Sequence, residues 1–348
     1  MALNAMVYIL LVLSLFLAFG IGANDETMAT VVGSGSLKLK ISVYIGGILV
    51  LLGCLFMSAE VGKTIGKNLL GSGSDGVGGL SADYDAKMML AVLLSTTIWL
   101  IVASQTGAPI STTHSVVGSI FGIAIFWSFI PGNSFTESIA WGEMLKVVLG
   151  WITSPILGFF MAMLFQWLLE LIMRKTKTNT GLLKVEKNEK IFMYILMASV
   201  FWTQFTRGGN DSANAVGIFF GLTGSYPELN TNLITYLYLG GAGLMIAFGL
   251  IVVGKNVIKS VGGSLVKMRP SDGVVIQLSS VLVLFIATLL KLPISGSHVL
   301  IFAILGASFI KGERPDKKSF RKMLVSWLIT FPVAATLSAI LYGLFLLF

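Results

Sequence analysis

Stretches of apolar sequence without a single charged residue recur along the whole of this chain. Their lengths suit a membrane, because a helix needs about 20 residues to cross a hydrocarbon core of about 30 Å. The run from Met88 to Thr136 is long enough for two passes. Further stretches of this kind are Met1–Asn24, Ile41–Ala59, Val147–Leu169, Leu229–Gly254, Gly273–Leu290, Leu292–Ile310 and Met323–Phe348. The sequence therefore predicts about ten hydrophobic helical segments.

The composition agrees with a chain that folds within a lipid bilayer. Hydrophobic residues make up 55% of the 348 residues and charged residues only 11%, whereas about a quarter of a soluble domain is charged. The first segment lacks a basic leader region and a small-residue cleavage pattern, so we expect it to remain as a membrane helix. The single Cys54 cannot form a disulfide within the chain and is expected to pack. The predicted fold class is an all-α polytopic membrane protein.

The formal net charge of +8 is concentrated between the apolar segments. Basic connections mark the cytoplasmic side of a membrane protein, so this charge predicts topology and no nucleic-acid partner. The most basic connections are Arg174–Lys190, Lys255–Arg269 and Lys311–Lys322, with a smaller group at Lys38 and Lys40. Five segments on either side of 174–190 place both termini outside. We predict a multi-pass protein of the cell (plasma or inner) membrane with its basic loops in the cytoplasm.

Two short motifs occur twice along the chain, in the same order. Gly22–Ala29 (GANDETMA) recurs as Gly208–Ala215 (GGNDSANA), an offset of 186 residues from Asn24 to Asn210. Pro109–His114 (PISTTH) recurs as Pro293–His298 (PISGSH), at an offset of 184 residues. An odd number of segments per half makes the two copies opposite in orientation.

Such duplication predicts two inverted-topology repeats, each interrupted by broken helices or re-entrant hairpins. The expected boundaries are an N-terminal repeat over 1–173, a cytoplasmic linker over 174–190 and a C-terminal repeat over 191–348. Inverted repeats with polar breaks at corresponding positions are typical of secondary transporters, in which the binding site lies near mid-membrane between the repeats.

The first motif provides hard oxygen ligands at the edge of apolar segments. Asp25 and Asp211 each follow an asparagine, and ionisable groups in such positions usually face a partner or a wet cavity. Carboxylate, amide and backbone oxygens suit hard cations, among which sodium fits. The alternative is that each Asp merely caps a helix at the membrane interface. Duplication of the Asn-Asp pair favours the cation site.

The second motif predicts a helix N-terminus inside the protein. Proline interrupts the preceding helix, and Ser111 or Ser295 then stands where a new helix begins. Free backbone N–H groups and the positive end of the helix dipole bind anions there, so a tetrahedral oxyanion suits the site. The alternative use of these small polar residues is helix–helix packing. His114 and His298 could relay protons, but we expect each to hydrogen-bond within the helix bundle.

An oxyanion beside two carboxylates needs cations. The repulsion is roughly 3 kcal/mol for each pair of unit charges at about 5 Å with an effective dielectric near 20. Cations bound between them remove this penalty, so sodium and the anion each raise the affinity of the other. The sequence shows no nucleophile paired with a base and no soluble catalytic domain, so we expect neither an enzyme nor an organic cofactor.

At these motifs the chain resembles the PiT family of inorganic phosphate transporters, whose signature is a Gly-Ala-Asn-Asp-like element in each half. Gly208–Gly217 (GGNDSANAVG) matches closely, whereas Gly22–Thr30 (GANDETMAT) departs after Asp25, which leaves the roles of Glu26, Thr27 and Met28 open. The resemblance covers essentially the whole chain. It implies cation-coupled phosphate uptake by an elevator-like or rocking mechanism, a homodimer, and essential roles for Asp25 and Asp211.

We therefore expect a sodium-coupled importer of inorganic phosphate that works by alternating access. The predicted phosphate-binding residues are Asp25, Ser111, Thr112, Thr113, Asn210, Asp211, Ser295, Gly296 and Ser297. The predicted sodium ligands are Asn24, Asp25, Asn210, Asp211, Ser111 and Ser295. The alternatives are a proton-coupled phosphate or sulfate symporter, an ion channel and, least of all, a membrane-embedded enzyme.

Overall fold

The computed structural model describes residues 5–62, 79–177, 182–223, 229, 231–289 and 294–347, and this part of the chain is built of helices. The helices of the first half are α1 (Ala5–Ala23), α2 (Ala29–Gly33), α3 (Leu39–Gly62), α4 (Leu80–Asp83), α5 (Ala86–Gln105), α6 (Thr112–Ser128), the short 3₁₀ helix η1 (Phe135–Glu137) and α7 (Trp141–Lys177). Those of the second half are α8 (Leu182–Thr223), α9 (Asn232–Gly249), the π-helical turn η3 (Leu250–Gly254), α10 (Lys255–Ser264), α11 (Pro270–Leu289), α12 (Gly296–Lys311) and α13 (Lys317–Phe345).

The predicted membrane class is confirmed. Within the described residues, seven helical segments are long and apolar enough to cross a membrane, and α6 and α12 are shorter apolar helices. With α8, which carries the second Asn-Asp motif, these account for the ten or so predicted segments. The apolar stretches coincide with helices throughout, for example Ile41–Ala59 with α3 and Val147–Leu169 with α7.

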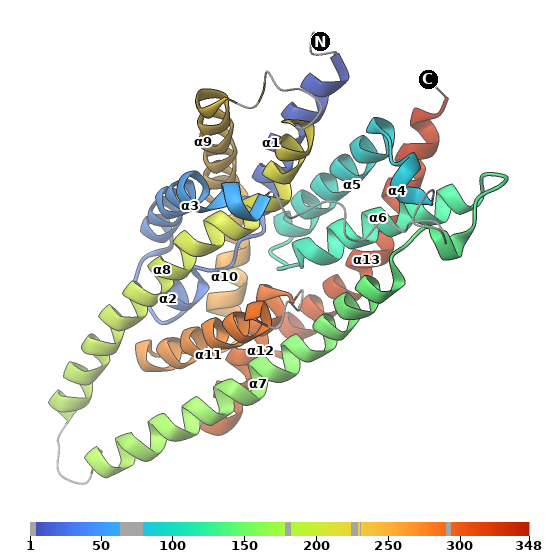
Figure 1. Cartoon of the computed structure of the whole chain (residues 1–348). Helices are drawn as coiled ribbons and strands as arrows, with labels where there is room; N and C mark the ends of the chain where they lie inside the picture. The colour runs from blue at the N-terminus through green and yellow to red at the C-terminus, as the bar shows by residue number, and fades with distance from the viewer. Residues whose placement is uncertain are drawn as a thin grey trace.

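The segment predicted as a linker is largely helical. Helix α7 extends to Lys177 and α8 begins at Leu182, so both helices continue well into 174–190. At about 1.5 Å per residue, α7 with its 37 residues is about 55 Å long, more than the apolar core of a bilayer requires. In Figure 1 these two helices converge at the end of the molecule opposite to the first turn of α1 and the last turn of α13.

Two helical hairpins reach into the middle of the protein. In the first, α5 ends at Gln105, Gly107 takes a left-handed φ of +74°, and Ser111 caps α6 by accepting a hydrogen bond from the backbone N–H of His114 at 3.3 Å. Pro109 cannot continue a helix, so the chain turns there. Helices α11 and α12 form the second hairpin; its Pro293 lies outside the described residues. Figure 1 shows the two hairpins opening towards opposite ends of the molecule.

Each half packs its last helix against the other half. Helix α6 lies along α13, and α12 lies along α7. The same exchange occurs near the N-termini of the halves, where α3 packs on α8 and α1 packs on α9. The two halves of the sequence therefore form one interlocked body.

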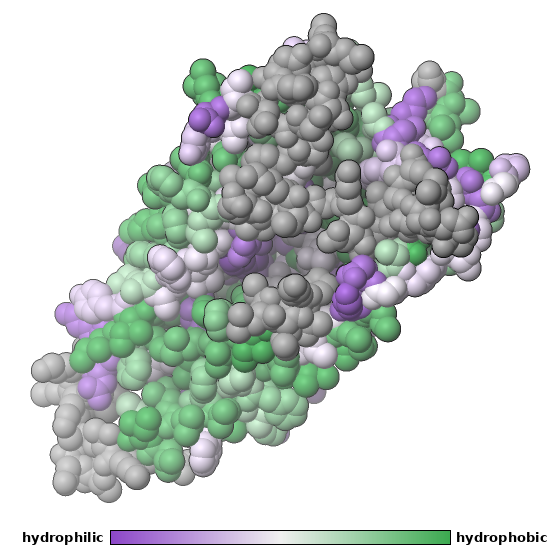
Figure 2. Space-filling view, viewed as in Figure 1, coloured by the Kyte–Doolittle hydropathy of each residue, from purple (hydrophilic) through white to green (hydrophobic). Residues whose placement is uncertain are grey.

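Apolar side chains cover much of the outer surface. In the view of Figure 2 they form broad areas along the lower edge, where α7 runs. Exposed residues of α7 include Ile152, Phe160, Leu164 and Trp167. Large exposed apolar areas mark an interaction surface, and on helices of this length the surface suits lipid tails.

Close helix approach depends on glycine at the crossing of α6 and α13. A Cβ atom added at Gly122 would overlap the carbonyl oxygen of Ala335 and the hydroxyl of Ser338. In membranes, where lipid is as apolar as the helices, small residues allow the close packing that holds helices together. Gly142, in the first turn of α7, has nothing within 4 Å of such an atom.

We predict that Gly122→Ala destabilises the fold, because the added methyl group forces α6 away from α13. Overpacking of this kind costs about 1–3 kcal/mol, so the melting temperature of the detergent-solubilised protein should fall by several degrees. Gly142→Ala is the matched control and should melt like the unaltered protein. Equal melting temperatures for both variants would show that this crossing does not limit stability.

Candidate anion and cation site

The first Asn-Asp motif breaks the helix that carries it. Helix α1 ends at Ala23, and the chain resumes a helical course only at Ala29. Within this break, Oδ1 of Asp25 accepts hydrogen bonds from the backbone N–H of Thr27 at 2.9 Å and from its hydroxyl at 2.6 Å. Asp25 thus shapes the local turn but does not cap α2, whose N-cap is Met28 without a side-chain hydrogen bond. The Oδ2 of Asp25 remains for other partners.

Asn24 fastens this break to the tip of the first hairpin. Its Oδ1 accepts from the backbone N–H of Ile110 at 3.0 Å, and its Nδ2 donates to the carbonyl of the same residue at 2.5 Å. The hydroxyl of Ser104 also donates to Oδ1, at 3.4 Å. A primary amide has both a donor and an acceptor, so it can pair with both polar groups of one peptide residue. Asn24 therefore acts as a clamp on the PISTTH motif.

The second Asn-Asp motif lies within the continuous helix α8, unlike the first. Gly208 lets α8 approach α3 closely, since a Cβ there would lie 2.6 Å from the carbonyl oxygen of Val50. The helical spacing places Asp211 one turn after Arg207 on the same face, whereas Asn210 points to an exposed position. The expectation of equivalent breaks in both copies thus fails at the second copy, because α8 remains hydrogen-bonded through the motif.

A charged cluster joins the two motifs in the middle of the protein. Arg207 donates through Nε to Oδ2 of Asp211 at 3.1 Å and through Nη1 to Oε1 of Glu26 at 2.9 Å. The same Nη1 donates to the hydroxyl of Thr27 at 2.8 Å and lies 3.8 Å from Oδ1 of Asp25. We call Asp25, Glu26, Arg207 and Asp211 the central cluster. With one guanidinium against three carboxylates, its formal charge is negative.

Buried polar groups surround this cluster. The side-chain amide of Gln204, one turn before Gly208 on α8, donates to Oδ2 of Asp25 at 2.5 Å. Glu26 is fully buried, and its Oε2 has no hydrogen-bond partner among the described residues. A small cavity adjoins the cluster and is lined by Ile21, Asp25, Val50, Arg207, Gly208, Asp211 and Ile246. Removing a charge from water costs free energy unless the charge is paired. Burial of Glu26 with one unpaired oxygen therefore indicates a functional role for this region.

The second hairpin presents the N-terminus of α12 to the central cluster. Ser295 caps the helix by accepting from the backbone N–H of His298 at 3.4 Å, and the hydroxyl of Ser297 donates to Oε1 of Glu26 at 3.1 Å. A Cβ at Gly296 would lie 3.7 Å from the guanidinium of Arg207. The predicted helix starts at Ser111 and Ser295 are confirmed, and at α12 the start faces charged groups.

The two hairpin tips meet through their histidines. The rings of His114 and His298 lie 4.8 Å apart, and each packs against a tryptophan: Trp151 at 4.0 Å and Trp327 at 4.2 Å. The Nε2 atoms of both histidines have no hydrogen-bond partner among the described residues. The structure therefore differs from the expected hydrogen bonding, because aromatic packing holds the rings. Trp327 also donates to the carbonyl of Pro109 at 2.8 Å.

The predicted site residues fall into three groups in the structure. Asp25, Asp211, Gly296 and Ser297 lie in or beside the central cluster, while Asn24, Ser111 and Ser295 hold the adjoining turns and helix starts. Thr112 and Thr113 are half-buried at the start of α6, without a side-chain hydrogen bond in the described structure, and Asn210 is exposed.

Arg207, Glu26 and Gln204 belong to the site but were not predicted from the sequence. A charged residue within an apolar segment is itself a signal of a functional site, and Arg207 stands one helical turn before Asp211. The sequence leaves the role of Glu26 open, because the motif departs from the family pattern at this position. Gln204 carries no such signal, since an uncharged amide in a helix resembles ordinary packing.

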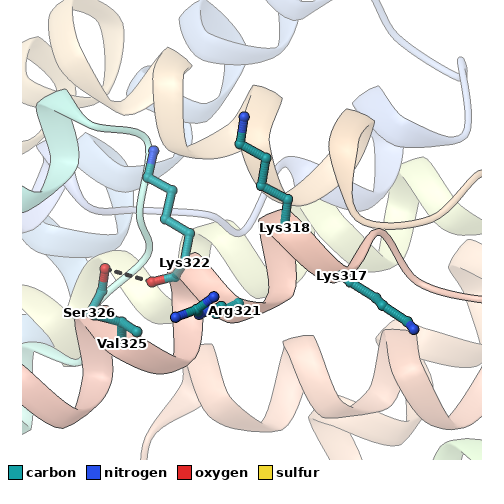
Figure 3. A pocket seen from close by; sticks show the side chains of 6 residues that line it. All are labelled: Lys317, Lys318, Arg321, Lys322, Val325 and Ser326. Atoms are coloured by element: carbon teal, nitrogen blue, oxygen red, sulfur yellow. Dashed lines mark hydrogen bonds between the residues drawn. The ribbon is translucent and has the colours of Figure 1, made fainter.

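A larger groove lies elsewhere, at the start of α13. Figure 3 shows its lining of Lys317, Lys318, Arg321, Lys322, Val325 and Ser326. Lys322 reaches from there to the carbonyl oxygen of Thr106, at the end of α5. These basic residues belong to the predicted cytoplasmic connection Lys311–Lys322. The groove contains no residue of the duplicated motifs.

A polytopic helical fold with two internal hairpins, whose tips meet beside a partly buried charged cluster, defines a membrane transporter class. Residues 21–338 match the model of the phosphate transporter family. The chain belongs to this family, which is one of transporters and not a class of enzymes.

Relatives span nearly the whole chain. A protein of Pyrococcus abyssi (strain GE5 / Orsay), named as a phosphate permease, is 28% identical and covers 95% of this chain and 96% of its own. A protein of Bacillus subtilis (strain 168), named as a low-affinity inorganic phosphate transporter, is 27% identical over 91% of this chain and 90% of its own. The solved structure titled "The sodium-dependent phosphate transporter" has a TM-score of 0.78 at 24% identity and covers 99% of this chain and 100% of its own. The likeness to that structure shows the fold.

We predict that Asn24→Asp lowers stability even without sodium or phosphate. The carboxylate keeps the shape of the amide but loses the donor to the Ile110 carbonyl and faces that oxygen instead. An unsatisfied buried group costs about 1–3 kcal/mol, so the melting temperature should fall.

The matched control is Asn133→Asp, which removes an amide donor to the carbonyl of Trp127 in a connection outside the central cluster. Its melting temperature should change less. If Asn24→Asp melts like the unaltered protein in sodium-free buffer, Asn24 does not clamp the hairpin tip.

Proposed function

We propose that this protein imports inorganic phosphate together with sodium ions by alternating access around the central cluster. The observation that carries the proposal is the meeting of the negative central cluster with the N-terminus of α12. The backbone N–H groups of Gly296 and Ser297 belong to the first turn of α12, where a helix leaves its N–H groups without intrahelical acceptors. Such donors at the positive end of a helix bind oxyanions.

Sodium coupling follows from the charge of the cluster. Three carboxylates around one guanidinium leave excess negative charge beside the anion site. Repulsion between unit charges about 5 Å apart is roughly 3 kcal/mol at an effective dielectric near 20, so phosphate needs cations at the carboxylates. Asp25, Asp211 and neighbouring carbonyl and amide oxygens, with Asn24, Asn210, Ser111 and Ser295 as the further predicted ligands, supply hard donors suited to sodium.

Alternating access has a structural basis in the exchanged packing of the halves. We propose that residues 1–173 and 191–348 are inverted repeats, joined through 174–190, since their hairpins open to opposite ends and pack reciprocally on α7 and α13. Rocking of the hairpins about the cluster would expose it to either side in turn.

We place the basic connections in the cytoplasm and both termini outside the cell membrane, following the positive-inside rule. The first turn of α1 and the last turn of α13 lie at the end of the molecule opposite to the last turn of α7, as this topology requires. A homodimer is part of the proposal on the strength of the family resemblance, and sizing of the detergent-solubilised protein by light scattering tests it.

The direct test is uptake of radiolabelled phosphate by proteoliposomes with and without an inward sodium gradient. Phosphate uptake should require sodium and resist excess sulfate. Uptake driven equally well by a proton gradient alone would instead support proton coupling, inhibition by sulfate would support a sulfate carrier, and single-channel currents would support a channel.

Asp25→Asn and Asp211→Asn should each reduce sodium-stimulated uptake about tenfold or more, because the loss of 1.4 kcal/mol of cation binding already amounts to a factor of ten. Glu143→Gln is the control: this carboxylate pairs with Lys146 at the surface, in the first turn of α7, and its loss should leave uptake unchanged. Near-normal uptake by either aspartate variant would show that the site lies elsewhere.

A further inference from the structure

Glu26 holds a position that an oxyanion ligand would occupy. Its Oε1 accepts from Nη1 of Arg207 at 2.9 Å and from the hydroxyl of Ser297 at 3.1 Å. A cationic guanidinium and a hydroxyl in the first turn of a helix are the donors that proteins use to bind phosphate. Here a carboxylate of the protein's own chain receives these hydrogen bonds.

The hydrogen bonds around Glu26 compensate only in part for the burial of its carboxylate. The side chain is fully buried, Oε2 has no partner among the described residues, and the carboxylate of Asp25 lies in the same cluster. Carboxylates this close repel each other. A buried carboxylate held on one oxygen only is easier to displace than one whose two oxygens are both satisfied.

The hydrogen-bond donors near Glu26 suit an anion with more oxygen atoms than the two of a carboxylate. Arg207 presents its guanidinium to Gly296, where a Cβ would lie 3.7 Å from Nη2. Gly296 and Ser297 are the first two residues of α12, and the N–H groups of a first helical turn have no intrahelical acceptor. A tetrahedral oxyanion at this helix start would reach Arg207, the Ser297 hydroxyl and these N–H groups together, whereas Glu26 reaches only the first two.

We propose that Glu26 competes with phosphate for Arg207 and Ser297, so that phosphate binding displaces the Glu26 carboxylate from the start of α12. This inference rests on the proposed function and names its anion-binding donors. Arg207 becomes the cationic phosphate ligand, and Glu26 sets the apparent affinity. A hydroxyl or guanidinium hydrogen serves one acceptor at a time, so occupancy by Glu26 reduces the fraction of the protein that is competent to bind.

The test is binding of radiolabelled phosphate to the full-length purified protein at fixed sodium concentration. Glu26→Gln keeps the shape of the side chain and removes its charge, and it should lower the apparent phosphate Kd by about threefold or more. Glu143→Gln is the matched control, because it neutralises a glutamate outside the site, and its Kd should equal that of the unaltered protein.

Neutralising a nearby charge could strengthen phosphate binding without competition, and a double-mutant cycle separates the two causes. If Glu26 and phosphate share donors, the gain from Glu26→Gln should shrink or vanish in the Ser297→Ala and Arg207→Gln backgrounds. Where Arg207→Gln does not yield a monodisperse protein, the Ser297→Ala arm decides.

Two results would overturn the inference: unchanged or weaker phosphate binding by Glu26→Gln, or an equal gain in the Ser297→Ala background. Failure of the proposed function would look different, because the unaltered protein would then show no sodium-dependent phosphate binding at all.

Discussion

Arg207 joins parts of the protein that are far apart in sequence, and the rest of the site is arranged around that contact. Its guanidinium links the break after α1, through Glu26 and Thr27, to Asp211 on α8. Removing an ion pair such as Arg207–Glu26 from water costs free energy, so the pair by itself is no evidence that it stabilises the fold. The guanidinium holds carboxylates of both halves together, and in the proposed mechanism it is also the cation that the transported anion contacts.

The two hairpins add helix N-termini to the charged region around Arg207. Pro109 lies in the turn of the first hairpin, Ser111 caps α6 and Ser295 caps α12, so two helix N-termini lie inside the protein. Asn24 fixes the first tip through Ile110, while the second tip reaches Glu26 through Ser297. In the proposed mechanism, a ligand bound between the tips contacts both halves of the chain, which couples binding to rearrangement of the halves.

The length of the apolar stretches predicted the helices. Proline predicted the hairpin breaks, and serine predicted the helix starts at Ser111 and Ser295, because these residues act on the local backbone. The contacts between site residues that are distant in sequence could not be predicted in this way. Arg207 and Glu26 are 181 residues apart, and no local rule pairs them. The duplicated motif also suggested equal geometry in both halves, yet α8 stays intact where α1 breaks. Gly208 and its neighbours allow packing against α3 there, so tertiary contacts override the local signal.

The most direct measurement of the central claim is anomalous diffraction at the arsenic edge from crystals grown with sodium and arsenate, a tetrahedral analogue of phosphate. We expect an arsenic peak at the start of α12, within hydrogen-bonding distance of Ser297 and Arg207 and beside Asp25 and Asp211. Arsenic found only in the basic groove at Lys317–Lys322, with none at α12, would contradict it.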